Sequence, residues 1–259
     1  LEPKDRNGRF IVSLYMWRMN RVLSVDKKSL IARIQAGVYG PHMEEQLEQE
    51  DVTLGHFPDS FVHSTLGGWV ATRSAGMQSD KYGKIEDMVI ALRMVTPSGT
   101  IVTRTVPNTS NGIDVRSLCV GSEGILGVIT EVTVQVHRLP EHKMFEGWLF
   151  PDFESGIKAI HECMRLGVMP VITRLNDPGK TALSAAFKKP ESGLKSKISA
   201  LVKWYLRAIK GFDFNQCCMM TTAYEGDYDT FHMQRRESSH IFRKHDGFCL
   251  GEGPGKSFQ

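Results

Sequence analysis

The sequence has no long apolar run and no large excess of charge. None of its 259 residues form anything near the roughly 20 consecutive apolar positions that a membrane-spanning helix needs. The net charge of +3 is too small to indicate a nucleic-acid partner. With 41% hydrophobic and 24% charged residues, the composition is typical of a soluble globular protein with one large or two modest domains.

The sequence also lacks the spacings of disulfide frameworks and metal sites. The cysteines are odd in number and have no CxxC spacing, which favours reduced thiols in an intracellular protein: Cys119, Cys163, Cys217, Cys218 and Cys249. Several histidines show no HExxH spacing and are expected on surfaces and helix faces: His142, His161, His232, His240 and His245. Neither a signal peptide in LEPKDRNGRF nor a Ser-Lys-Leu type ending in GEGPGKSFQ is present.

Two stretches rich in glycine, serine and threonine are the most informative features. They are PDSFVHSTLGGWVATRSAG (58–76) and GSEGILGVITEVTVQV (121–136). Glycines allow close backbone approach, and a helix opening at Thr65 would direct free N–H groups at an anion. Neither stretch fits GxGxxG or GxxxxGK[ST], and an ordinary loop is the alternative. The spacing alone therefore gives only a weak hypothesis of an anion site.

Apolar periodicity and turn residues predict the elements of the first half. We expect a helix at 42–50, with Met43 and Leu47 on one face and a solvated acidic flank. The first glycine-rich stretch should fold as a loop followed by a helix, and Gly121–Gly127 as a tight loop. The expected strands are 11–15, 21–25, 30–36, a hairpin of 88–95 with 100–106 around Pro97–Gly99, and 128–136.

A change of character at Leu139-Pro140 predicts a domain boundary. Beyond it we expect a helix at 154–166 with Ile157, Ile160 and Met164 on its apolar face. A helix at 198–209 should turn Leu201 and Trp204 inward. The remaining expected elements are strands at 168–175, 218–224 and 248–250 and a helix at 230–245. This order favours an α+β sheet with helices on one face.

The two stretches, with YGKIEDMVIALRMVTPSGTIV between them, resemble the PCMH-type FAD-binding domain of vanillyl-alcohol oxidase-like flavoproteins. Within that superfamily, MNRVLSVD, LGHFPDS, VITRLND and IKGFDFNQ look like the alkyldihydroxyacetonephosphate synthases of ether-lipid synthesis. The resemblance runs from Ile11 to Glu252. It implies an α+β fold with part of the FAD-binding domain at 1–139, its second subdomain, and an α+β cap domain at 140–259. It also implies that further flavin-binding chain precedes Leu1 and that a catalytic tyrosine and a histidine-rich loop follow Gln259.

The resemblance assigns FAD as cofactor and two sets of residues to it. Backbone amides near Gly67, Gly68 and Gly124 are expected to bind pyrophosphate or flavin oxygens. Alternatively, Val62, Leu126, Val128 and Ile129 are core residues that only line the pocket, and His63 has no separate role. The cofactor-binding residues are Asp59, Ser60, Phe61, Val62, His63, Ser64, Thr65, Gly67, Gly68, Thr72, Arg73, Ser74, Ala75, Glu123, Gly124, Ile125, Leu126, Gly127, Val128 and Ile129.

Arg174 is the catalytic residue that the resemblance implies. Arg174 is a charged residue within a strand-like segment, between Ile172 and Leu175, a position that indicates a specific role. It would hold a substrate phosphate or stabilise negative charge near the flavin. The alternative is a structural ion pair with Asp177.

The implied activity exchanges the acyl group of acyl-dihydroxyacetone phosphate for a long-chain fatty alcohol, without net flavin redox turnover. A homodimer in a peroxisome or glycosome-like organelle is expected by the same resemblance. The segment KKPESGLKSK and the helix after it are interpreted as a solvated loop and a core helix, or as a membrane-facing surface. Two alternatives stay open: an FAD-dependent D-lactate or glycolate dehydrogenase, and a truncated, non-catalytic remnant.

Overall fold

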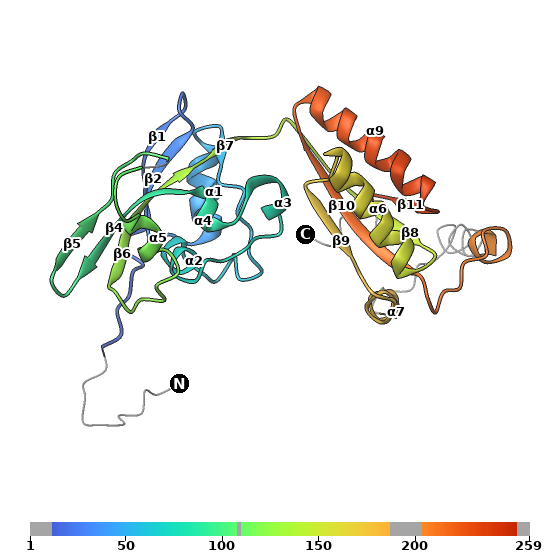
Figure 1. Cartoon of the computed structure of the whole chain (residues 1–259), viewed down its shortest axis with the longest axis horizontal. Coiled ribbons are helices and arrows are strands. Elements are labelled where there is room, and N and C mark those ends of the chain that lie inside the picture. The colour runs from blue at the N-terminus through green and yellow to red at the C-terminus, as the bar shows by residue number, and fades with distance from the viewer. Residues whose placement is uncertain (1–11, 108–109, 187–203, 253–259) are drawn as a thin grey trace. The chain divides into compact units, whose positions relative to one another are not determined.

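The computed structural model describes residues 12–107, 110–186 and 204–252. The chain divides into two compact units, Leu1–Leu139 and Pro140–Gln259 (Figure 1). Each unit has its own antiparallel sheet and its own hydrophobic core. Within the described ranges, no helix has the length and apolarity needed to cross a membrane.

A five-stranded antiparallel sheet organises the first unit. Its strand order is β1-β2-β6-β4-β5, and Val132 of the central strand faces Ile34 on one neighbour and Leu92 on the other. All three side chains are buried, so the middle of the sheet is the centre of this core. The strands are β1 (Val22–Asp26), β2 (Ile31–Gln35), β4 (Val89–Thr96), β5 (Gly99–Val102) and β6 (Val128–Gln135).

Short helices complete the first unit by adding large apolar side chains to the same core. Met43 and Leu47 of α1 and Leu66 and Trp69 of α2 are buried against the strands. A two-stranded sheet joins β3 to β7. These elements are α1 (Gly40–Glu48), β3 (Val52–Thr53), α2 (Leu66–Thr72), α3 (Ser79–Tyr82), α4 (Ile85–Met88), α5 (Val115–Cys119) and β7 (His137–Arg138).

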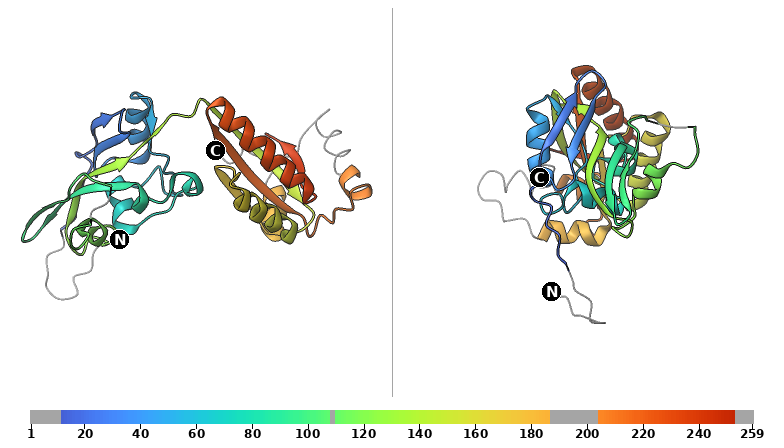
Figure 2. Two further views of the ribbon diagram at one scale, coloured as in Figure 1. Left: turned by 45° about the horizontal axis from the view of Figure 1, so that its top comes forward. Right: turned by 90° about the vertical axis from the view of Figure 1, so that its left-hand side faces the viewer.

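The second unit is a four-stranded antiparallel sheet with two long helices, α6 and α9, on one face (Figure 2). Trp148 and Phe150 from the sheet meet Phe242 of α9 edge to face, and Cys163 of α6 joins the same core. The strand order is β11-β8-β10-β9. The elements are β8 (His142–Phe150), α6 (Phe153–Leu166), β9 (Ile172–Leu175), α7 (Pro178–Ala186), β10 (Cys218–Gly226), α9 (Tyr228–Lys244) and β11 (Phe248–Gly251).

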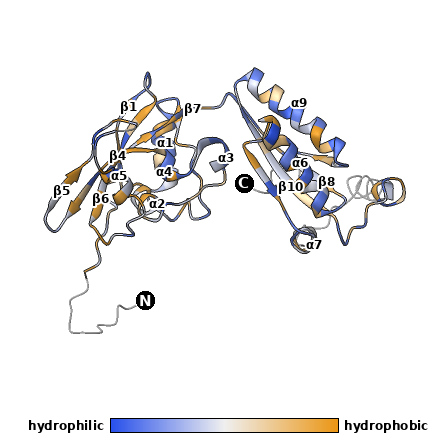
Figure 3. Cartoon of the chain, viewed as in Figure 1, coloured by the Kyte–Doolittle hydropathy of each residue, from blue (hydrophilic) through white to orange (hydrophobic). Residues whose placement is uncertain are grey.

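Most of the expected elements are present, but of the three apolar residues expected on α6 only Ile160 packs against the core. Ile157 and Met164 are 47% and 64% exposed, whereas the small residues Gly156, Ala159 and Cys163 face the sheet. A Cβ added to Gly156 would lie 2.7 Å from a methyl carbon of Leu175, so helix and strand approach too closely for large residues there. Figure 3 shows hydrophobic and hydrophilic residues mixed along α6 and α9.

Other expectations from the sequence are wrong in detail. Residues 12–15 form no strand, and Val12 is 83% exposed. The acidic flank of α1 is not wholly solvated, because Glu44 is buried. Trp204 is 59% exposed, and Leu206 is buried with Phe212 in its place. Strand β8 was not predicted, and Leu201 and KKPESGLKSK lie outside the described residues.

Candidate functional site

The two glycine-rich stretches meet in the first unit. The N–H groups of Gly121 and Glu123 donate to the carbonyl oxygens of Val70 and Ala71, both at 2.9 Å. These carbonyls belong to α2, so the second loop is tied directly to the helix of the first stretch. Sequence positions about fifty residues apart therefore form one continuous surface.

Arg73 adds a second link between the stretches. It ends α2 in the left-handed conformation, and its side chain crosses to the chain just before Gly121. Its Nε donates to the Val120 carbonyl at 3.0 Å, and its Nη2 donates to the Ser117 carbonyl at 3.1 Å. The guanidinium thus holds the end of α5 against the end of α2.

The start of α2 does not present free N–H groups to an anion. Thr65 caps the helix, accepting a hydrogen bond from the Gly68 N–H at 3.3 Å. The Leu66 and Gly67 N–H groups donate to the Val38 and Ala36 carbonyls, at 3.0 and 2.7 Å. The Gly67 N–H is thus used by the Ala36 carbonyl and the Gly68 N–H by the Thr65 side chain. These contacts give no support to the prediction that the two amides bind pyrophosphate, and it stays a prediction.

The segment before α2 is a series of turns closed by a serine pair. The Ser64 hydroxyl donates to the Ser60 carbonyl at 2.7 Å and accepts from the indole N–H of Trp69 at 2.6 Å. Phe61 stacks on Trp69 with ring centroids 6.0 Å apart. The predicted residues Asp59, Ser60, Val62 and His63 are exposed around this anchor.

The loop after α2 rests on a buried histidine that the sequence reasoning missed. His56 is fully buried, and its Nε2 lies 2.7 Å from the Ser74 hydroxyl. Burial lowers its pKa to about 4, so the ring is neutral at physiological pH. Its Nδ1 has no hydrogen-bond partner in the described structure. Ala75 on this loop and Thr72 at the end of α2 are exposed.

The loop at 121–127 has exposed main chain at Gly124 and a buried side-chain hydroxyl at Ser122. Gly124 is exposed at φ +83°, and a Cβ there would meet nothing within 4 Å. Glu123 and Ile125 beside it are exposed, while the Ser122 hydroxyl is buried without a hydrogen-bond partner among the described residues. Leu126 packs on the core and Ile129 is 7% exposed within it, which favours the core interpretation for these two.

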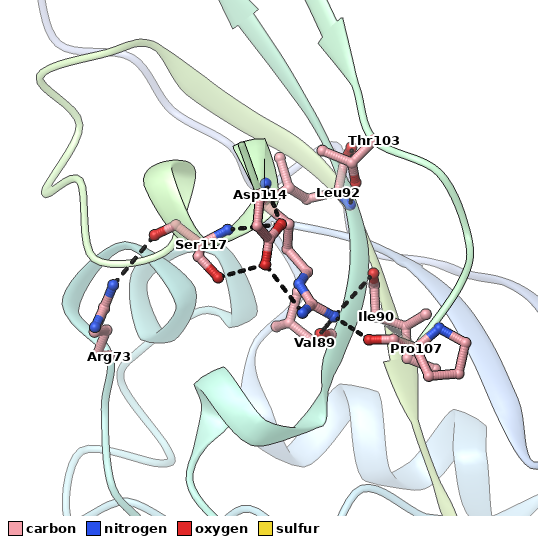
Figure 4. Close-up of polar contacts among 9 residues, drawn as sticks. Arg73, Val89, Ile90, Leu92, Thr103, Pro107, Asp114 and Ser117 are labelled. Carbon is pink, nitrogen blue, oxygen red and sulfur yellow. Dashed lines mark hydrogen bonds and ion pairs between the residues drawn. The ribbon is translucent and has the colours of Figure 1, made fainter. Parts of the chain in front are cut away.

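The chain before this loop is fixed by Asp114 and Arg116 (Figure 4). Asp114 caps α5, accepting from the Ser117 hydroxyl at 2.6 Å and the Arg116 N–H at 3.0 Å. The Arg116 guanidinium donates to the carbonyls of Val89 and Pro107, at 3.2 and 3.0 Å. A neighbouring hollow of ≈ 470 Å³ is lined by Arg116 among others, and Arg116 and Asp114 in its wall already serve these structural bonds.

Arg174 lies in the second unit, on β9, directly opposite Thr221 of β10. The next residue, Leu175, packs with α6, so Arg174 points to the face of the sheet without α6 and α9. Its side chain is half-buried. Asp177, the partner in the alternative interpretation, accepts from the Lys180 N–H at 2.9 Å at the start of α7.

The scattered histidines have local structural contacts. His245 lies 2.7 Å from Glu162, and His142 packs against Phe231. Among the described residues, no group of three or more His, Cys, Asp or Glu side chains could hold a metal ion. The five cysteines are free thiols.

Comparison with known proteins identifies both units. Residues 3–105 match the model of the FAD binding domain, and residues 139–250 match the model of the C-terminal domain of FAD linked oxidases. The two units are thus similar to the two domains that these models describe. The sequence prediction of a PCMH-type FAD-binding domain followed by an α+β cap domain, with FAD as cofactor, is confirmed.

Individual relatives point to one branch of the family. The chain is 43% identical to alkyldihydroxyacetonephosphate synthase of Dictyostelium discoideum and 42% identical to that of Trypanosoma brucei brucei, over all of its own length. A solved alkyldihydroxyacetonephosphate synthase structure matches 98% of the chain with TM-score 0.86 and 43% identity. The chain spans 42% of the length of both curated relatives and 46% of the solved chain.

Proposed function

We propose that the protein containing this chain is an FAD-dependent alkyldihydroxyacetonephosphate synthase. The observation that carries the proposal is the 43% identity to the Dictyostelium discoideum synthase, which extends through both units. The reaction replaces the acyl group of acyl-dihydroxyacetone phosphate with a fatty alcohol. The bond between C1 and the ester oxygen breaks, the fatty acid leaves with the electron pair, and the alcohol oxygen bonds to C1 as it gives up its proton.

The surface formed by the two glycine-rich stretches is the proposed FAD contact. It fits the cofactor because Gly124 offers exposed main chain with open space around it, and the neighbouring Ser122 hydroxyl is buried with no partner in the described part of the chain. Thr72 at the end of α2 and Ala75 on the loop after it are exposed. When bound, the flavin would supply an electron sink for the reaction. Arg73 and His56 keep the two loops in place through the contacts described above.

Several residues that were predicted to bind FAD instead pack within the first unit. Gly67 lies so near Ala36 that a Cβ would be 2.9 Å from its side chain, and Ile129 belongs to the core. We therefore assign direct contact to the exposed positions of the two loops. These are Asp59, Ser60, Val62, His63, Thr72, Ala75, Glu123, Gly124 and Ile125.

Arg174 is the proposed catalytic cation of the cap unit. A guanidinium keeps its charge at any working pH and presents donors in a planar fork that matches phosphate or carboxylate oxygens. Arg174 lies on β9, on the face of the sheet without α6 and α9. In this proposal it holds the anionic end of the substrate and orients the carbon that reacts. That orientation lowers the barrier by replacing random encounter with a fixed geometry.

The test uses the full-length protein purified with FAD. Palmitoyl-dihydroxyacetone phosphate and labelled hexadecanol should give a labelled ether together with free palmitate. Rapid bleaching of the flavin by D-lactate, without ether formation, would instead identify a 2-hydroxy-acid dehydrogenase. A colourless protein that gains no flavin absorbance when FAD is added would support the non-catalytic remnant.

The resemblance also supports proposals on partners and location. A homodimer that draws its lipid substrates from a membrane surface in a peroxisome or similar organelle is consistent with the substrates proposed above. Sedimentation of the full-length protein, binding to phospholipid vesicles and imaging of a tagged copy test these three points separately.

A further inference from the structure

We propose that the Thr221 hydroxyl is a second donor to the substrate anion held by Arg174, and that this anion is a phosphomonoester. The inference rests on the proposed function and deepens it by naming a residue that touches the substrate phosphate. It starts from a polar group that folding leaves unsatisfied. Thr221 is 0% exposed, and its Oγ1 has no hydrogen-bond partner among the described residues.

The strand register places this hydroxyl beside Arg174. Thr221 on β10 pairs directly with Arg174 on β9. Directly opposed residues of an antiparallel pair point to the same face, with Cβ atoms roughly 4.5–5.5 Å apart. A guanidinium and a hydroxyl at that separation can reach oxygens of a single phosphate.

The neighbours of Thr221 along β10 show which face this is. The Met220 side chain belongs to the core under α6 and α9, and the Tyr224 hydroxyl lies 2.9 Å from the Ser238 hydroxyl of α9. Because side chains alternate along a strand, Met220, Thr222 and Tyr224 face the helices. Thr221 and Arg174 therefore share the opposite face.

The same row of the sheet has no further side chains. Thr221 pairs on its other side with Gly147 of β8, and Gly147 pairs with Gly251 of β11. A Cβ added to Gly251 would meet nothing within 4 Å. An anion held by Arg174 and Thr221 would thus have glycine main chain, and no competing side chain, on the next two strands.

The free energies of folding and of anion binding distinguish a threonine that binds the ligand from one that has no role in binding. A buried hydroxyl without a partner destabilises the folded chain relative to a satisfied one, and a hydrogen bond to a charged group is stronger than a neutral one. A threonine kept at this position therefore lowers the stability of the free protein and strengthens binding of the anion. Replacing it with valine should have opposite effects on stability and on affinity.

The adjacent Thr222 provides a matched control. It is also 0% exposed, but it faces the helices and its hydroxyl donates to the Glu146 carbonyl at 3.3 Å. Thr222→Val removes a satisfied hydroxyl and should lower the melting temperature without changing phosphate binding. Thr221→Val should raise the melting temperature of the free protein by roughly 2–4 °C.

The experiment uses the full-length protein with FAD. In Thr221→Val we expect the KM for the phosphorylated substrate and the inhibition constant for inorganic phosphate to rise about 10- to 100-fold, as loss of a charged hydrogen bond predicts. Thr221→Ser, which keeps the donor, should stay close to wild type in both constants. An unchanged KM and inhibition constant in Thr221→Val, or a melting temperature that falls as in Thr222→Val, would overturn the inference.

Failure of the inference can be separated from failure of the proposed function. Protection of the wild-type protein against heating by inorganic phosphate needs no turnover. If that protection depends on Thr221 but no ether forms, the anion site stands and the synthase assignment fails. If ether forms and phosphate protects Thr221→Val as well as wild type, the synthase assignment stands and the role of Thr221 fails.

Discussion

Glu44 gives a quantitative test of the packing beneath the first glycine-rich stretch. Its carboxylate lies on α1, is 6% exposed, and accepts from the Thr53 hydroxyl at 2.7 Å and the Leu54 N–H at 3.2 Å. Burial raises its pKa from 4.5 to about 7, outweighing these two hydrogen bonds. Glu44→Gln should remove this titration while a neutral side chain of the same size remains.

The direction of the pH effect follows from the raised pKa. Between pH 4.5 and 7 the folded chain binds more protons at Glu44 than the unfolded chain, so its contribution to stability is complete below 4.5 and is lost as pH rises through 7. The rise in the pKa of Glu44 from 4.5 to about 7 corresponds to about 3 kcal/mol, since a tenfold change in proton affinity is worth roughly 1.4 kcal/mol.

His56 opposes this trend in the wild-type protein. Its pKa is lowered from 6.5 to about 4, so its contribution is present above 6.5 and is lost as pH falls through 4. The two effects overlap between pH 4.5 and 6.5 and partly cancel there. The pH dependence of the free energy of unfolding of the wild-type protein therefore does not separate Glu44 from His56. The difference in this free energy between wild type and variant is the quantity to measure.

Urea unfolding of wild type and Glu44→Gln at pH 5 and pH 8 supplies that difference. We expect similar free energies of unfolding at pH 5 and a variant more stable by up to about 3 kcal/mol at pH 8. Glu45→Gln, on the exposed side of the same helix, should show no such pH-dependent difference. A Glu44→Gln difference that is the same at both pH values would refute the reasoning.

Three further predictions concern the loops and the cap unit. Arg174→Lys in the full-length protein should lower kcat about 10- to 100-fold because the planar donor fork is lost, while the flavin absorbance of the purified protein stays normal. Arg73→Ala should weaken FAD binding, measured by fluorescence titration, because the bonds to Val120 and Ser117 disappear; unchanged affinity would contradict the linking role. Gly127→Ala should cost about 1–3 kcal/mol in urea unfolding, since its Cβ would lie 2.3 Å from the Val95 carbonyl oxygen.

The sequence predicted elements where the signal is local. The hairpin around Pro97–Gly99 and the strand after Gly127 appear as expected, because turn residues and alternation are read from adjacent positions. The inward face of α6 was not predictable from size alone. Leu175, a distant residue in the sequence, decides that small side chains such as Gly156 pack there.

The sequence allowed us to predict which two segments form the candidate site. It did not allow us to predict the hydrogen bonds within the site. The resemblance placed both stretches in one FAD-binding domain, and the structure joins them through Glu123 and Ala71. The acceptors of the Leu66 and Gly67 N–H groups come from residues after β2, about thirty positions away, so no local pattern reveals them. His56 carries only a weak signal, a histidine between Gly55 and Phe57 in an otherwise apolar segment.

The glycines of the two stretches can be sorted by what a side chain would meet. At Gly67 and Gly127 a Cβ would approach neighbouring chain at 2.9 and 2.3 Å, so packing within the unit requires glycine at both. At Gly124 a side chain would meet nothing, and only the positive φ of the loop demands glycine. Packing does not explain why this loop is bare at an exposed position. The positive φ explains the glycine, and the exposed main chain that results is the reason that Gly124, more than Gly67 or Gly68, marks the surface on which we propose to place the flavin.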